Sequence, residues 1–123
     1  MTGTVTAERF VAALGARDFD GVEALLAPDV RFRALVPRAL REHDNAADTA
    51  GRFPLWFGEP EVFEVLDSTV GEVSGRIHVA YRFRVLDEEG WQVVEQQAYL
   101  DAPEGRITDI SIVCSGVVPV DAP

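Results

Sequence analysis

The sequence predicts an α+β domain in which three N-terminal helices pack against one curved sheet of antiparallel strands. Apolar residues recur at helical spacing over residues 7–26 and 44–57. After residue 62 they alternate instead with polar residues between turn-forming segments, which is typical of antiparallel strands. The chain has 123 residues, 47% of them hydrophobic, so residues 1–123 suit a single domain with its own core.

The helical part of the sequence contains three segments. Thr6 suits the N-cap of the first helix, because its hydroxyl can accept a hydrogen bond from an unpaired first-turn amide. A second short helix over residues 19–26 ends at Pro28, which cannot continue it. A third helix is predicted over residues 44–57, and Pro54 within it is expected to bend or shorten it.

The predicted strands are recognised by their alternation and are separated by turn residues. They cover residues 30–36, 62–70, 77–85, 91–100 and 107–113. The polar segment 38–45 is expected to be a loop, and the tail 117–123 is expected to be loose. A long, twisted sheet of such strands can curl around the helices, and the hollow between them is a natural ligand site.

Composition disfavours several classes of function. The net charge of −10 argues against nucleic acids and anionic membranes as partners. Two histidines without a cysteine cluster, and the lack of a glycine-rich phosphate loop, predict neither a metal nor another cofactor. No apolar run approaches the ~20 residues of a membrane helix, and the first ten residues do not resemble a signal peptide. With Cys114 as the single cysteine, no intramolecular disulfide can form, and we expect a cytoplasmic protein.

Resemblance to a known family is most specific over residues 7–37, which read AERFVAALGARDFDGVEALLAPDVRFRALVP. This segment is similar to the opening of the nuclear transport factor 2-like superfamily, which includes ketosteroid isomerases and SnoaL-like polyketide cyclases. Residues 104–112, EGRITDISI, resemble the usual last strand of that superfamily. The resemblance implies a cone-shaped sheet around three helices and a homodimer formed through the outer sheet face. Trp91 and Tyr99 offer aromatic area of the kind enriched at interfaces.

The same resemblance locates the family's catalytic positions. Where ketosteroid isomerases have a tyrosine on the first helix, this chain has Phe10, which has no hydroxyl to donate. The aspartate that acts as general base matches Ala34, which cannot move a proton. The protonated aspartate that donates to the substrate oxygen falls near Gln96. The acidic residue of SnoaL-like cyclases falls on Cys114 or Ser115, so neither known mechanism is expected here.

If Ala34 points inward, the parity of the strands predicts a mainly apolar pocket with a few polar groups. Its expected lining is Phe10, Phe32, Ala34, Trp56, Tyr81, Phe83, Gln96, Ile112 and Cys114. Such a lining suits a hydrophobic small molecule with one or two oxygen atoms.

Two acid/base candidates depend on local details. A slip of one residue would turn Glu95 inward in place of Gln96, and an apolar cavity would raise the pKa of that carboxyl. His43, just before the third helix, can border the cavity in this fold. Three functions therefore stay open: binding of a hydrophobic small molecule, an isomerase, lyase or cyclase with a non-standard site, and a protein-interaction module with a filled cavity. The two missing catalytic groups favour binding.

Overall fold

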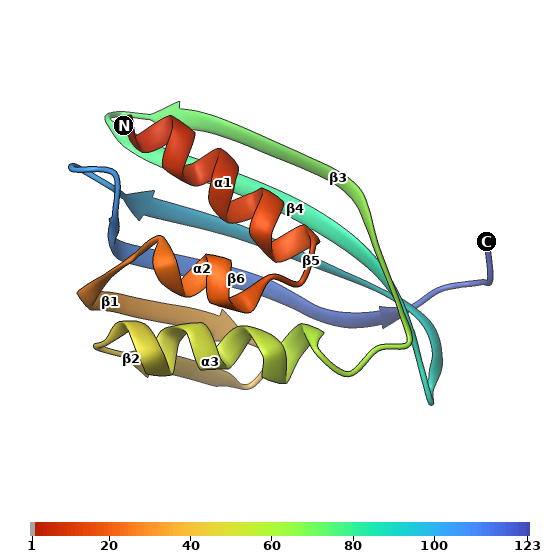
Figure 1. Ribbon diagram of the computed structural model, residues 1–123. Coiled ribbons are helices and arrows are strands. Elements are labelled where there is room, and N and C mark those ends of the chain that lie inside the picture. Colours follow the sequence, from red (N-terminus) through yellow and green to blue (C-terminus); the bar gives the residue numbers. More distant parts are fainter. Residues whose placement is uncertain (1) are drawn as a thin grey trace.

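All three helices lie on one face of a single curved, six-stranded sheet (Figure 1). This computed structural model describes residues 2–123. The helices are α1 (Gly3–Gly15), α2 (Phe19–Ala24) and α3 (Ala46–Phe57). The strands are β1 (Leu26–Val36), β2 (Ala39–His43), β3 (Val62–Val73), β4 (Arg76–Asp87), β5 (Gly90–Asp101) and β6 (Ile107–Pro119). Their order in the sheet is β2-β1-β6-β5-β4-β3.

The predicted α+β class with a curved sheet is confirmed, but the sheet is mixed rather than wholly antiparallel. Strands β1 and β6 run parallel, with Phe32 opposite Ile110 and Ala34 opposite Ile112. The chain leaves β2 through α3, enters the sheet again at its far edge as β3, and returns by three antiparallel steps. The last of these steps places β6 beside β1 in the same direction, which alternation along single strands does not reveal.

Helix α1 begins one turn earlier than the sequence suggested. Thr2 is its N-cap, and its Oγ1 accepts a hydrogen bond of 3.2 Å from the amide of Val5. The prediction that Thr6 caps the helix is wrong, because its buried hydroxyl donates instead to the carbonyl of Gly105 at 2.9 Å. Thr6 therefore ties α1 to the turn between β5 and β6, a tertiary role that local patterns do not show.

Two segments expected to be irregular are strands. Residues 39–43 form β2, which pairs with β1 through a tight turn in which Arg38 has φ +66°. This edge strand is short and mostly exposed, so it lacks the alternation that identifies strands. Strand β6 continues through Pro119, and Val117 and Val118 pair with β5. The prediction of a loose tail is therefore wrong for residues 117–119. Pro54 lies inside α3 without ending it before Phe57.

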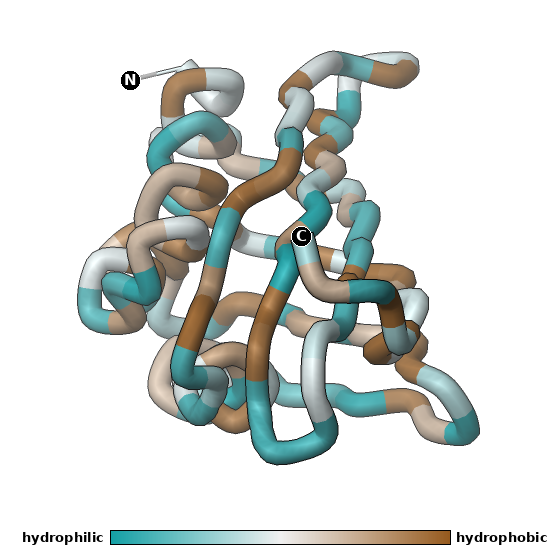
Figure 2. The backbone as a smooth tube through the Cα atoms, turned by 90° about the vertical axis from the view of Figure 1, so that its right-hand side faces the viewer, coloured by the Kyte–Doolittle hydropathy of each residue, from teal (hydrophilic) through white to brown (hydrophobic). Residues whose placement is uncertain are grey.

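The core lies between the helices and the concave face of the sheet. Figure 2 shows the helices on one side and the strands on the other, with hydrophobic and hydrophilic residues alternating along the strands. Aromatic rings dominate the interior: Phe10 meets Phe53 edge-on at 5.7 Å between centroids, and Phe57 meets Phe83 at 5.2 Å. All four side chains are at most 2% exposed.

One arginine joins the α1–α2 connection to the segment that follows α3. Arg17, in the left-handed region at φ +53°, donates to the carbonyls of Phe57 at 3.3 Å and Pro60 at 2.9 Å. Its guanidinium also lies 5.1 Å from the centroid of the Phe63 ring. These contacts hold the end of α3 against the first two helices.

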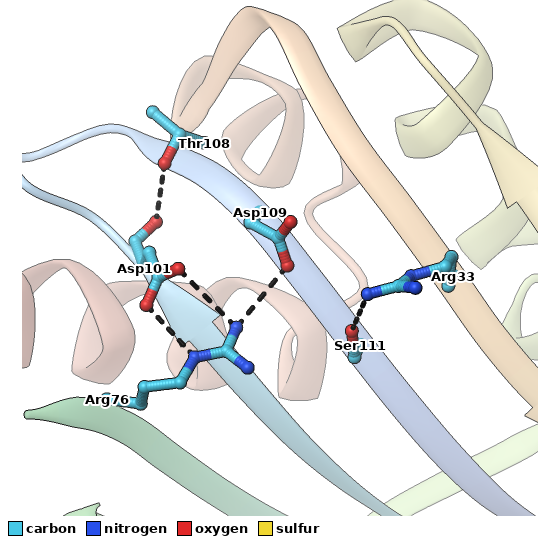
Figure 3. Close-up of polar contacts among 6 residues, drawn as sticks. All are labelled: Arg33, Arg76, Asp101, Thr108, Asp109 and Ser111. Carbon is cyan, nitrogen blue, oxygen red and sulfur yellow. Dashed lines mark hydrogen bonds and ion pairs between the residues drawn. The ribbon is translucent and has the colours of Figure 1, made fainter. Parts of the chain in front are cut away.

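The convex face of the sheet, which points away from the helices, carries a charged cluster at one end (Figure 3). Arg76 bridges Asp101 at 3.1 Å and Asp109 at 3.3 Å, and so joins β4, β5 and β6. Beyond this cluster the face is partly apolar: the exposed fractions are 55% for Leu35, 40% for Tyr99 and 60% for Val113.

Candidate functional site

Three side chains meet across neighbouring strands on the concave face. Gln96 on β5 pairs with Tyr81 on β4 and with Cys114 on β6 in the register of the sheet. Tyr81 and Gln96 are each 1% exposed, whereas Cys114 is partly exposed and packs against the core. Glu95 lies on the opposite face and is exposed, so the structure does not bring this acid/base candidate to the site.

Tyr81 and Gln96 form a buried polar pair. The Tyr81 hydroxyl donates to Gln96 Oε1 at 2.5 Å. The amide nitrogen of Gln96 has no hydrogen-bond partner among the described residues. A buried donor without an acceptor costs about 1–3 kcal/mol, so an oxygen atom brought by a ligand would satisfy it.

Tyr81 is a neutral donor at this site. Its burial, and to a lesser degree repulsion from the Cys114 thiolate, raise the pKa of the Tyr81 hydroxyl well above its ordinary value. The hydroxyl therefore keeps its proton throughout the physiological range. It can hold an amide or a ligand oxygen, but it cannot serve as a base.

A bulge in β6 adjoins Cys114. The ladder between β5 and β6 is interrupted opposite Glu95, whose amide donates to Ser115 Oγ at 2.9 Å instead of to a backbone carbonyl. Gly116 adopts φ +72°, and a Cβ there would lie 2.7 Å from Pro37 Cγ. The Gly116 amide donates to Cys114 Sγ at 3.4 Å. Sequence reasoning missed this bulge, although a glycine inside a strand pattern is its usual signal.

The remaining predicted pocket residues surround the polar pair. Phe10, Phe32, Ala34, Phe83 and Ile112 are buried, and Trp56 is partly buried. The Tyr81 ring stacks on Phe83 at 5.1 Å and lies 6.4 Å from Phe10 between centroids. Trp56 packs against Phe32 at 6.2 Å.

These rings lie in the region that the sequence assigned to a chamber, and both members of the polar pair are buried there. Hollows of about 380 to 550 Å³ open at the surface of the described chain. None of these five is lined by Phe10, Ala34, Tyr81 or Gln96. The apolar pocket therefore stays a prediction. In this conformation a ligand reaches the polar pair only if neighbouring side chains move.

His43 lies away from the polar pair. It ends β2 opposite Phe32, whose ring it stacks on at 5.5 Å, and its Nε2 accepts from Arg52 Nε at 3.3 Å. That row of the sheet continues to Ile110 and Leu100, so it does not include Gln96. His43 instead borders a polar surface hollow of about 380 Å³, lined also by Arg31, Phe32, Arg33, Glu42, Asp44 and Asp48.

The described residues hold no group of three or more histidine, cysteine or acidic side chains placed to bind a metal ion. None of the helices in residues 2–123 is both long and apolar enough to cross a membrane. The arrangement on the concave face therefore offers hydrogen-bond donors, one thiol and aromatic surface. Its nearest titratable groups are the hydroxyl of Tyr81 and the thiol of Cys114.

Comparison with solved structures shows the same fold in several proteins. A candidate polyketide cyclase from Xanthomonas campestris is similar at 20% identity and a TM-score of 0.70, with 89% of this chain and 87% of that chain covered. An epoxide hydrolase resembling limonene epoxide hydrolases, from M. tuberculosis, gives 20% identity, a TM-score of 0.69, and coverage of 91% and 81%. A protein of ketosteroid isomerase-like fold from Catenulispora acidiphila, solved with trimethylamine, gives 12% identity, a TM-score of 0.73, and coverage of 94% and 88%.

No curated protein matches the chain by sequence. The family model of the SnoaL-like domain matches residues 7–110, which is most of the chain and includes both the N-terminal helices and the strands that carry Tyr81 and Gln96. The chain therefore belongs to the SnoaL-like domain family, within the nuclear transport factor 2-like superfamily.

Proposed function

We propose that this domain binds a hydrophobic small molecule on the concave side of its sheet and holds an oxygen atom of that molecule with Gln96. The observation that carries the proposal is the amide nitrogen of Gln96, which is buried and has no partner among the described residues. Buried amides are nearly always paired, and an exception in a native fold calls for a functional explanation. A carbonyl or ether oxygen of a ligand supplies the missing acceptor.

The surroundings support an apolar ligand and simple binding. Aromatic side chains enclose the polar pair, so a ligand there gains dispersion and hydrophobic contacts. The positions that hold proton-transfer groups in ketosteroid isomerases are Phe10 and Ala34, both buried and without titratable groups. With Tyr81 neutral, no carboxylate or imidazole at the site moves a proton, which favours binding over isomerisation.

Access to the polar pair requires movement of a side chain at the edge of the core. Trp56 and Cys114 are partly exposed where the other lining residues are buried. A rotation of Trp56 away from Phe32 and Phe53 exposes aromatic surface to an incoming ligand. If these rings do not move, the interior is a filled core and the domain acts as a protein-interaction module instead.

The test compares two glutamines on adjacent positions of β5. Gln96 faces the concave side, and Gln97 is exposed on the convex side. Titration calorimetry with cyclohexanone, acetophenone and 2-naphthol measures binding to the original chain, to Gln96→Leu and to Gln97→Leu. We expect Gln96→Leu to weaken binding roughly tenfold or more, because a hydrogen bond contributes about 1–3 kcal/mol at a buried site. Equal affinities for both variants, or no binding by the original chain, would contradict the proposal.

We also propose that the protein forms a homodimer through the convex face of its sheet and that it is cytoplasmic. Leu35, Tyr99 and Val113 expose apolar surface on adjoining strands of that face. The free thiol of Cys114 suits a reducing compartment. The net charge of −10 leaves nucleic acid and anionic membrane as unfavourable partners. Sedimentation velocity tests the dimer: Val113→Arg is expected to shift the protein to monomer, and an unchanged sedimentation coefficient would contradict this interface.

A further inference from the structure

Cys114 and Gln96, whose amide nitrogen has no partner among the described residues, are neighbours on the concave face. The two residues are direct partners across the β5–β6 ladder, so their Cβ atoms are separated by about 5 Å. Cys114 is partly exposed, whereas Gln96 is 1% exposed. The side chain of Cys114, which packs against the core, thus adjoins a buried donor that lacks an acceptor.

We propose that Cys114 and Gln96 form a site that captures α,β-unsaturated carbonyl compounds covalently. This inference rests on the proposed ligand site and adds a reaction to it. An enone carries its electrophilic β-carbon and its oxygen at opposite ends of one short conjugated unit. A ligand of this class can therefore place its oxygen at Gln96 Nε2 and its β-carbon at Cys114 Sγ together.

The chemistry balances without any further reactant. The Cys114 thiolate forms a bond from Sγ to the β-carbon, the carbon–carbon π bond breaks, and its electron pair moves to give an enolate. The enolate oxygen accepts a hydrogen bond from Gln96 Nε2. The proton lost by the thiol returns, through water, to the α-carbon. The product is a saturated thioether that contains every atom of the thiol and of the enone.

Gln96 is better matched to the enolate than to the starting ketone. Negative charge develops on the oxygen as the bond to sulfur forms, and a fixed donor in a dry site stabilises developing charge strongly. Tyr81 is a positioning residue in this scheme. Its hydroxyl donates a hydrogen bond of 2.5 Å to Gln96 Oε1, so the nitrogen of the amide is the end that faces the ligand.

The backbone also positions the sulfur. The bulge at residues 115–116 turns the Gly116 amide back to donate to Cys114 Sγ at 3.4 Å. Because Cys114 is the single cysteine of the chain, any thiol adduct reports on this site alone.

The experiment compares two thiol reagents on the full chain. 2-Cyclohexen-1-one needs stabilisation of a developing oxyanion, whereas methyl methanethiosulfonate only reports access to the thiolate. Intact-protein mass spectrometry at one fixed pH gives the labelling rate for each reagent. We expect one cyclohexenone adduct on the original chain and none on Cys114→Ser. Gln96→Leu is expected to slow the cyclohexenone reaction at least roughly tenfold and leave the thiosulfonate reaction nearly unchanged.

Two further variants serve as controls. Gln97→Leu, on the other face of the same strand, is expected to change neither rate. Tyr81→Phe keeps the aromatic packing and frees the amide, so it is expected to slow cyclohexenone selectively and by less than Gln96→Leu. It also provides a second measurement if Gln96→Leu does not fold.

Four outcomes would overturn covalent capture: no adduct on the original chain, an adduct on Cys114→Ser, equal slowing of both reagents by Gln96→Leu, or no effect of that variant. Calorimetry with cyclohexanone, the saturated ketone, distinguishes a failure of covalent capture from a failure of the proposed ligand site. Gln96-dependent binding of cyclohexanone without a cyclohexenone adduct overturns capture alone. Absence of both overturns the ligand site as well.

Discussion

Tyr81 donates a 2.5 Å hydrogen bond to Gln96 in the interior, and the same glutamine leaves its amide nitrogen without a partner. One half of the amide is therefore satisfied by the fold and the other half is not. Within this one amide, the oxygen contributes to the stability of the fold and the nitrogen is available to a ligand, which gives a direct prediction for stability.

Removal of one member of the pair is expected to cost more than removal of both. Tyr81→Phe leaves both ends of the Gln96 amide buried without partners, so it is expected to lower the free energy of unfolding by about 1–3 kcal/mol. Gln96→Leu removes the unpaired nitrogen but leaves the Tyr81 hydroxyl without an acceptor, so its net cost is smaller.

The double variant leaves no unpaired polar group at the site, and we expect a coupling energy of roughly 1–3 kcal/mol. Urea denaturation of the four proteins measures it. Additive effects of the two substitutions would show that the hydrogen bond does not couple them.

Stability is expected to fall at high pH because of Tyr81. Its folded pKa is raised by burial above the unfolded value near 10, so the folded state holds the proton more tightly than the unfolded state. This contribution is fully present below about pH 10 and is lost at about 1.4 kcal/mol per pH unit as the pH rises further.

Denaturation between pH 8 and 11 checks this dependence, with Tyr81→Phe as the comparison. The variant lacks the ionising group and is expected to lose less stability over the same range. Parallel curves for the two proteins would contradict the assignment to Tyr81.

Gly116 is expected to tolerate no side chain. Its φ of +72° disfavours any L-residue, and an added Cβ would lie 2.7 Å from Pro37 Cγ. Gly116→Ala is therefore expected to cost about 1–3 kcal/mol of unfolding free energy. Gly71→Ala is the matched control, because a Cβ at that strand glycine meets nothing within 4 Å. Chemical denaturation that gives the same midpoint for both variants would contradict the role of the bulge.

Arg17 is expected to stabilise the junction between α1, α2 and the segment after α3. Arg17→Ala removes two hydrogen bonds to backbone carbonyls and the contact with the Phe63 ring, which together contribute about 1–3 kcal/mol. Arg9→Ala, at an exposed position of α1, is expected to change stability by less than about 0.5 kcal/mol. Thermal unfolding compares the two, and similar midpoints would show that the Arg17 contacts contribute little.

Much of the fold could be predicted from local patterns. The alternation along residues 91–100 predicted the strand and left Gln96 or Glu95 as its inward residue, and the structure buries Gln96. The order of helices and strands followed from apolar spacing in the same way. Strand β2 could not be predicted, because neither face of this exposed edge strand is buried and its residues therefore do not alternate between apolar and polar.

The site could be predicted only in part, for a different physical reason. Register brings Tyr81, Gln96 and Cys114 together, which matches one of the two strand parities that the sequence left open. The bulge beside Cys114 depends on Pro37, which lies far from it in sequence. Whether rings such as Phe10 and Phe53 fill a chamber or line it depends on their rotamers and mutual packing, which residue types do not determine.

The parallel pairing of β1 with β6 has a consequence for synthesis of the chain. The edge of β1 that β6 covers stays unpaired on the ribosome until residues 107–113 have been made, because β6 follows every other strand of the sheet in the chain. Contacts of such long sequence separation form slowly and leave strand edges open to aggregation in the meantime. The nascent domain therefore depends on β6 both to join β1 to the rest of the sheet and to bring Cys114 beside Gln96.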